Sequence, residues 1–187
     1  TISDQQYNFV REKIKKLNIE SNINLIKKDY REINGLYDKI VSIEMLEGVG
    51  YKYWDVYFSK LRRLIKNDGI ISLQTITIKD EVFNYYKSNP DFIQKYIFPG
   101  GMLPSIAILE KIIIKNSLKI ISIDSYYLDY VKTLKMWRDN FENSLPRIKE
   151  LGFDNKFLRL WSYYLTYCES GFKSKNIDLN QIKIVPI

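Results

Sequence analysis

Three consecutive segments within residues 37–78 limit the folds that this chain can adopt. The sequences "YDKIVSIEML" (37–46) and "IISLQTITI" (70–78) are apolar runs of strand length. Between them, "YKYWDVYFSKLRRLIKNDG" (51–69) has helical periodicity and closes on an Asn-Asp-Gly stop signal. A strand–helix–strand series forms a parallel pair of strands, and nearly continuous apolar strands are typically buried on both faces. We therefore expect an α/β fold with a mostly parallel sheet.

The rest of the chain supplies further helices and strands around this unit. Apolar spacing predicts helices at 3–18, 104–116, 129–150 and 154–172, and strands at 22–29, 118–127 and 181–187. Residues 81–105 are aromatic and interrupted by prolines and glycines, which is typical of short helices and loops. Because no linker-like segment divides the chain, we expect residues 1–187 to form a single domain.

The composition excludes several classes of site. The chain contains no histidine, which excludes His-based triads, His general bases and His metal sites. A single cysteine excludes an internal disulfide and indicates a reducing, cytoplasmic environment. The net charge of +7 favours an anionic partner, although a solvated basic surface explains it equally. Because Lys and Arg are scattered rather than clustered, we expect an acidic membrane surface and no nucleic acid.

Two carboxylates follow the apolar run Ile40–Ile43, in the sequence "EMLEGVG". Ligands of open α/β sheets bind at the carboxyl ends of parallel strands, so Glu47 is a candidate site residue. A solvated loop acid is an equal alternative, and Glu44 keeps that interpretation. Gln74 lies inside the apolar strand 70–78, where a buried amide needs hydrogen-bond partners.

Cys168 and Tyr130 are weaker candidates when judged from spacing alone. Cys168 falls among apolar residues at helical spacing within 154–172, which favours a buried and inert thiol. Nucleophilic catalysis by Cys168 is disfavoured because no histidine is available to activate it. Tyr130 opens the preceding helix, where packing is its simplest role.

Five motifs resemble one enzyme family in order along essentially the whole chain. The motifs "VSIEMLEGVG", "YIFPGGMLPS", "DYVKTLKMW", "GFDNKFLRLWSYYLTYC" and "SGFK" are similar to those of the cyclopropane-fatty-acyl-phospholipid and mycolic acid cyclopropane synthases. The resemblance implies a Rossmann-like class I fold that uses S-adenosylmethionine (SAM). It further implies an antiparallel C-terminal edge strand and added helices that cover the site of an acyl chain.

The chemistry that the resemblance implies is methyl or methylene transfer to the double bond of an unsaturated phospholipid acyl chain. The alkene attacks the sulfonium methyl group, and a bound bicarbonate removes a proton from the resulting cation. The products are cyclopropane or methyl-branched chains. Such an enzyme is expected in the cytoplasm, peripherally attached to the inner face of the membrane. The resemblance leaves open whether the protein forms a homo-oligomer.

The resemblance also assigns residues. Glu47 matches a glutamate that holds bicarbonate, Tyr130 matches a tyrosine that binds it, and the backbone of Ile76 lines the same site. Cys168 matches an active-site cysteine. Gln74 stands where the family usually has a histidine ligand of bicarbonate, which makes ring closure less certain than methyl transfer.

The cofactor residues implied by the resemblance lie near the start of the chain, and no metal is implied. Residues bordering the ribose and methionine parts of SAM are Thr1, Ile2, Ser3, Asp4, Gln5 and Gln6, and Tyr30 and Arg31 flank the adenine.

One departure concerns the start of the fold. The first strand of the family and its glycine-rich SAM loop do not precede Thr1. We therefore expect a truncated domain that needs an N-terminal portion, which a separate gene could encode. The alternative is that strand 22–29 pairs directly with strand 37–46. An inactive remnant or a lipid-surface binding module is the alternative function.

Overall fold

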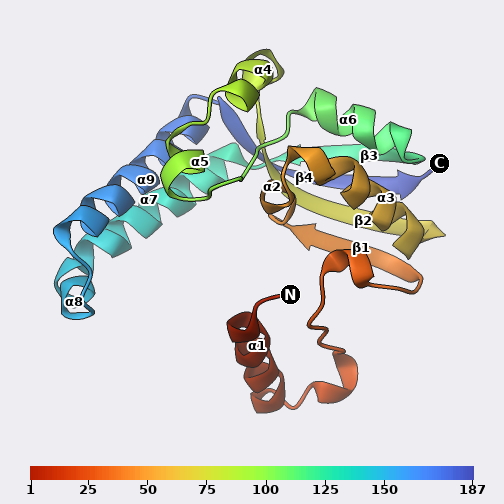
Figure 1. Ribbon diagram of the computed structural model, residues 1–187, viewed down its shortest axis with the longest axis horizontal. Coiled ribbons are helices and arrows are strands. Elements are labelled where there is room, and N and C mark those ends of the chain that lie inside the picture. The colour runs from red at the N-terminus through yellow and green to blue at the C-terminus, as the bar shows by residue number, and fades with distance from the viewer. The chain divides into compact units, whose positions relative to one another are not determined.

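A computed structural model describes residues 1–187 as two compact units, Thr1–Leu36 and Tyr37–Ile187. Figure 1 shows the elements of both.

The first unit contains one long helix and two 3-10 turns. Helix α1 (Asp4–Lys16) confirms the expected helix, and the Ser3 hydroxyl caps it by accepting a hydrogen bond from the Gln6 amide. The turns are η1 (Glu20–Asn22) and η2 (Tyr30–Glu32). The strand expected at 22–29 does not form, because no neighbouring strand supplies a hydrogen-bonded ladder and Asp29 instead caps η2.

The second unit is built on a four-stranded mixed sheet with the order β1-β2-β4-β3. The strands are β1 (Tyr37–Ile43), β2 (Ile65–Ile78), β3 (Leu118–Ser125) and β4 (Ile177–Pro186). As expected, β1 pairs with β2 in parallel, and β4 runs antiparallel to its neighbours. However, β4 lies between β2 and β3, so the expected edge position of the C-terminal strand is wrong. The inner position gives β4 a backbone ladder on both sides. The pairing of 22–29 with 37–46 is also absent, because β1 pairs only with β2.

The junction between α3 (Trp54–Leu64) and β2 differs from the expected helix 51–69. The chain enters β2 at Ile65, which pairs with Tyr37, and the next pair is Lys39 with Ile70. Residues 66–69 therefore bulge out opposite Asp38. The Asn-Asp-Gly signal forms this bulge rather than a helix stop, and a Cβ at Gly69 would lie only 2.9 Å from the Asp38 carbonyl oxygen.

Helices α3 and α6 (Ile106–Lys115) lie over one face of the sheet (Figure 1). The Tyr57 hydroxyl of α3 donates to Ser42 Oγ at 2.6 Å, which identifies the β1 side chains that point toward this layer. Val41 and Ile43 point to the opposite face and are 67% and 63% exposed. The expected burial of this strand on both faces is therefore wrong in this chain.

A helical layer packs against the end of the sheet. Its helices are α7 (Tyr127–Asn143), α8 (Leu145–Glu150) and α9 (Asn155–Lys173). Leu134 of α7, Leu165 and Phe172 of α9, and Leu179 of β4 form one buried core. The single helix expected at 129–150 is interrupted at Ser144, because Pro146 cannot continue the hydrogen bonding of α7 and instead sits in the first turn of α8.

Short elements complete the unit. They are α2 (Leu46–Val49), η3 (Tyr51–Tyr53), α4 (Asp80–Ser88) and α5 (Phe92–Tyr96). The last two confirm the short helices expected within 81–105. None of the helices has both the length and the apolar character needed to cross a membrane.

Candidate functional site

The second unit contains a cavity of about 1290 Å³ where the strand ends meet the helical layer. Its walls come from the loop after β1, from β2, from the α4–α5 segment, and from α7 and α9. Most side chains on these walls are apolar or aromatic. Polar groups converge at the strand end, where Glu44, Glu47, Tyr130 and Cys168 line the cavity. This combination is typical of a ligand site for an apolar molecule.

Glu47 is held against β2 by one carboxylate oxygen. Its Oε1 accepts hydrogen bonds from the Ile76 amide at 2.7 Å and from Thr75 Oγ1 at 2.9 Å. Its Oε2 is buried without a partner. Burial raises the pKa of Glu47, and the nearby Glu44 carboxylate raises it further, although the bonds from Ile76 and Thr75 oppose the shift. One oxygen of the Glu47 carboxylate is therefore hydrogen-bonded and the other is not, in a largely apolar cavity. A carboxyl group with a shifted pKa in such a cavity is a common feature of functional sites.

The "FPGGM" turn fixes the backbone of Glu47. The Met102 amide donates to the Glu47 carbonyl oxygen at 3.0 Å, and Gln94 Nε2 donates to the Gly101 carbonyl oxygen at 3.0 Å. A Cβ at Gly101 would lie 3.0 Å from the Phe98 carbonyl oxygen, so a side chain there would crowd the turn. Two motifs that are far apart in the sequence thereby hold one carboxylate in place.

Glu44 has a backbone conformation that is rare for its residue type. Its φ is +50°, and its amide donates to the Gln74 carbonyl oxygen at 2.9 Å. Gln74 Nε2 donates to Glu44 Oε1 at 3.0 Å, while Gln74 Oε1 accepts from Gln181 Nε2 at 2.9 Å. The Tyr130 hydroxyl donates to the same Glu44 oxygen at a longer 3.4 Å. The structure thus makes Glu44, expected as a solvated loop acid, part of the cavity wall.

The sequence contains a signal for Glu44, but the signal can be recognised only when the register of the strands is known. Ile43 pairs with Gln74, so Glu44 is the residue immediately after a paired position and lies beside the one amide in an apolar strand. Gln181 also pairs with Gln74 on the other side. The polar row across three strands is visible only once their order is known.

Tyr130 and Cys168 lie on the helical wall of the cavity. The ring of Tyr130 contacts Phe172 at a centroid distance of 4.8 Å, and its hydroxyl faces Glu44. Burial raises the pKa of Tyr130, so it stays a neutral donor. Burial also raises the pKa of Cys168 to about 12, which keeps it a thiol and disfavours nucleophilic action.

The residues that the resemblance assigned to one site divide between the two units. Glu47, Ile76, Tyr130 and Cys168 line the cavity, and Gln74 reaches it through Glu44. The expected cofactor residues Thr1–Gln6, Tyr30 and Arg31 all belong to the unit Thr1–Leu36.

The chemistry of the first unit fits a nucleoside. Hydroxyl and amide groups gather at the start of α1, where Thr1 Oγ1 donates to Gln6 Oε1 at 2.7 Å. The Arg31 guanidinium is clamped to Asp29 by two hydrogen bonds, of 2.9 Å and 2.8 Å, and these bonds lower the pKa of Asp29 to about 2. Neutral polar groups suit ribose hydroxyls, and the Tyr30 ring offers an aromatic surface to adenine.

Bicarbonate fits the second unit less well. The unpaired Glu47 Oε2 would accept a hydrogen bond from the hydroxyl of bicarbonate. However, Gln74 Nε2 and the Tyr130 hydroxyl, which the resemblance directs at bicarbonate, donate to Glu44 instead. The Glu44 carboxylate also adds negative charge where an anion would bind. We therefore assign no step to bicarbonate. No group of three or more His, Cys, Asp or Glu residues is arranged to hold a metal ion.

Comparisons with known proteins agree with the resemblance. The family model described as mycolic acid cyclopropane synthetase matches residues 1–182. The tuberculostearic acid methyltransferase UfaA1 of Mycobacterium tuberculosis (strain ATCC 25618 / H37Rv) is 36% identical over 186 residues, which are 99% of this chain and 44% of that protein. The cyclopropane-fatty-acyl-phospholipid synthase of Escherichia coli (strain K12) is 33% identical over 184 residues, which are 97% of this chain and 45% of that protein. The chain spans about half the length of the curated relatives it matches.

Solved structures agree at the level of the fold. The crystal structure of mycolic acid cyclopropane synthase CmaA1 complexed with SAH and CTAB superposes with a TM-score of 0.83 and 27% identity, and covers 98% of this chain and 67% of that one. The cyclopropane synthase MmaA2 from Mycobacterium tuberculosis has a TM-score of 0.88 at 23% identity, with the same coverage. The expected α/β methyltransferase fold is thereby confirmed. Since the family model matches nearly every residue, the chain belongs to the mycolic acid cyclopropane synthetase family.

Proposed function

We propose that this chain is part of an enzyme that transfers a methyl or methylene group from SAM to the double bond of an unsaturated phospholipid acyl chain. The observation that carries the proposal is the large apolar cavity with the half-buried Glu47 at its polar end, where its Oε2 is buried and unpaired. The names of the relatives, a tuberculostearic acid methyltransferase and a cyclopropane-fatty-acyl-phospholipid synthase, support the same substrate class.

The cavity suits an acyl chain and a cationic transition state. Apolar side chains such as Ile78, Leu134 and Phe172 bury the hydrocarbon and exclude water, which would otherwise trap a carbocation. The aromatic faces of Tyr130 and Tyr164 line the same space and stabilise positive charge. The walls therefore bind the chain and protect the reacting carbon.

The first unit would hold the cofactor through the groups at Thr1–Gln6 and through Tyr30 and Arg31. Bound SAM supplies an electrophilic methyl group on a positively charged sulfur. In the second unit, the Ile76 amide and Thr75 hydroxyl orient Glu47, whose charge favours a cation at the cavity end.

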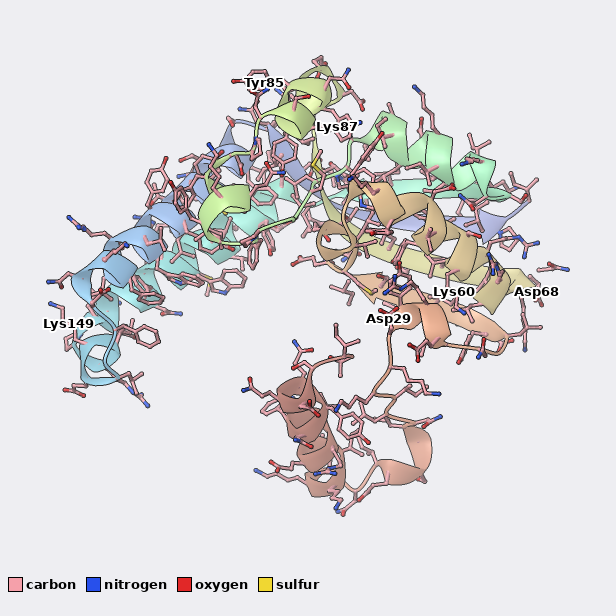
Figure 2. The ribbon with its side chains drawn as sticks, in the orientation of Figure 1. Asp29, Lys60, Asp68, Tyr85, Lys87 and Lys149 are labelled. Atoms are coloured by element: carbon pink, nitrogen blue, oxygen red, sulfur yellow. The ribbon has the colours of Figure 1, made fainter.

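Substrate access is proposed at a membrane surface. Tyr85, Phe98 and Trp137 line the cavity and are 73%, 55% and 48% exposed, which places aromatic groups at its mouth. Figure 2 shows Tyr85 and Lys87 projecting from α4. Together with the net charge of +7, these groups favour peripheral, salt-sensitive attachment to anionic lipid. Sedimentation with anionic vesicles at low and high salt tests this, and retention at high salt would contradict it.

The function is tested by co-expressing the chain with any protein segment encoded immediately upstream, in a host with unsaturated phospholipids. Gas chromatography with mass spectrometry should detect methylated, methylene-bearing or cyclopropane acyl chains. Glu47→Gln should lower their yield, while Glu110→Gln, an exposed acid on α6, is the matched control and should not. If no modified lipid appears with the parent protein, the enzyme proposal fails in favour of a lipid-binding module or an inactive remnant.

A further inference from the structure

Glu44 combines three features that a solvated loop residue does not need. Its backbone has a positive φ of +50°, a conformation that is unfavourable for a residue with a side chain. Its carboxylate accepts two side-chain hydrogen bonds, from Gln74 and Tyr130. It also lines the same cavity as Glu47. Strain that the surrounding structure maintains is often found at functional sites.

The hydrogen bonds to Glu44 form a chain across three strands. Gln181 Nε2 on β4 donates to the side-chain oxygen Oε1 of Gln74, and this bond fixes which end of the Gln74 side-chain amide faces β1. The Gln74 amino group is thereby directed at the Glu44 carboxylate. Tyr130 approaches the same oxygen from α7. Donors from the sheet and from the helical wall therefore hold one fixed anion at the polar end of the cavity.

Both donors are the groups expected to bind bicarbonate, and they are directed at a carboxylate supplied by the chain itself. A carboxylate has the same trigonal pair of acceptor oxygens as bicarbonate. We propose, on the basis of the function proposed above, that Glu44 replaces bicarbonate as the base that accepts the proton lost by the methylated acyl chain.

The proton transfer balances without a further reactant. After the alkene electron pair has bonded to the methyl carbon, one C–H bond of that carbon breaks. Its electron pair closes the third C–C bond of a cyclopropane. Alternatively, once a hydride has shifted from the methylated carbon to the neighbouring cationic carbon, the pair forms the C=C bond of a methylene group. In both cases the proton passes to a Glu44 oxygen. Glu44 then returns the proton to water when the product leaves.

The experiment measures turnover in carbon-dioxide-free buffer and again with added bicarbonate. Its variants are Glu44→Gln, which keeps the acceptor but cannot take the proton, and Glu44→Gly, which removes the side chain and relieves the positive φ. Glu110→Gln is the matched control. The protein is the chain co-expressed with any upstream-encoded segment, as above.

We expect the parent and the control to be insensitive to bicarbonate. Glu44→Gln should lose about 100-fold in turnover, the contribution typical of a general base. Glu44→Gly should regain turnover when bicarbonate is added, because the anion then reaches the donors of Gln74 and Tyr130.

A second measurement does not depend on activity. In thermal unfolding, Glu44→Gly should have a midpoint equal to or above that of the parent, because glycine tolerates a positive φ. Bicarbonate should raise the midpoint of Glu44→Gly alone, by binding its folded state.

The inference is overturned if the parent requires bicarbonate or if Glu44→Gln keeps full turnover. These outcomes differ from failure of the proposed function, in which the parent yields no modified lipid with or without bicarbonate.

Discussion

Glu47 and Glu44 both follow β1, but a backbone amide and the Thr75 hydroxyl hold the Glu47 carboxylate, whereas side chains alone hold the Glu44 carboxylate. Glu47 is half-buried, and β2 holds one of its oxygens while the other has no partner. Glu44 is exposed toward the cavity and is held by Gln74 and Tyr130. A backbone partner is the same for any sequence, whereas a side-chain partner depends on which residues are present. The position of the Glu47 carboxylate therefore depends in part on the backbone of β2, whereas the position of the Glu44 carboxylate depends on the side chains around it.

The largest expected effect is that of Glu47→Gln on turnover. Removal of the carboxylate should lower turnover about 100-fold or more, because fixed charge at the reacting centre is a large catalytic contribution. Affinity for SAM, measured by calorimetry, should be nearly unchanged. A loss of SAM affinity as large as the loss of turnover would show instead that Glu47 holds the cofactor. Glu47 and Glu44 would then not be two acids of the same reacting centre.

A smaller effect is expected for Tyr130→Phe. The substitution removes one donor to Glu44 while the ring still packs on Phe172. Loss of one hydrogen bond to a carboxylate should lower turnover about tenfold. The thermal midpoint should stay close to that of the parent. Unchanged turnover would show that Gln74 alone is sufficient to hold Glu44.

The pH dependence of the free energy of unfolding tests the effect of burial on Glu47. Burial raises the pKa of Glu47 above its ordinary 4.5, so the folded state holds its proton more tightly than the unfolded state. Stability should therefore fall as pH rises from 4.5 through the raised value. Glu47→Gln, which keeps the acceptor for the Ile76 amide, should be more stable than the parent at pH 7 and equal below pH 4.5.

This expectation is checked by urea unfolding across the pH range, with Glu110→Gln as the matched variant. A constant difference between Glu47→Gln and the parent at every pH would show that the ionisation of Glu47 does not contribute.

The smallest effect is expected for Cys168→Ala. The pKa of about 12 keeps Cys168 a thiol, so turnover should stay within about twofold of the parent. Native protein should also react slowly with iodoacetamide at pH 8.5. Abolished turnover with an unchanged thermal midpoint would show that the thiol takes part in the chemistry.

Elements with local signals were predictable from the sequence. Ser3 ahead of a periodic segment predicted the start of α1, and the apolar run before Glu47 predicted β1 and the candidate acid at its end. Capping and periodicity act within a few residues, so they are readable before any tertiary contact exists.

Elements that depend on distant partners were not predictable in the same way. Residues 22–29 have the composition of a strand but no neighbour to pair with. The Asn67–Gly69 signal was assigned to a helix end, although Asp38 on the facing strand makes it a bulge. In both cases the deciding hydrogen bonds join segments that the sequence does not place together.

Motifs, caps and apolar periods are local patterns, so the amino-acid sequence indicated the family, most of the helices and strands, and the place of Glu47 just after β1. The position of β4 inside the sheet, and with it the pairing of Gln181 with Gln74, depends on contacts between distant segments. That neighbour orients the amide toward Glu44. The physical reason is that a side-chain hydrogen bond needs partners within about 3 Å, and strand order alone brings these three residues to that distance.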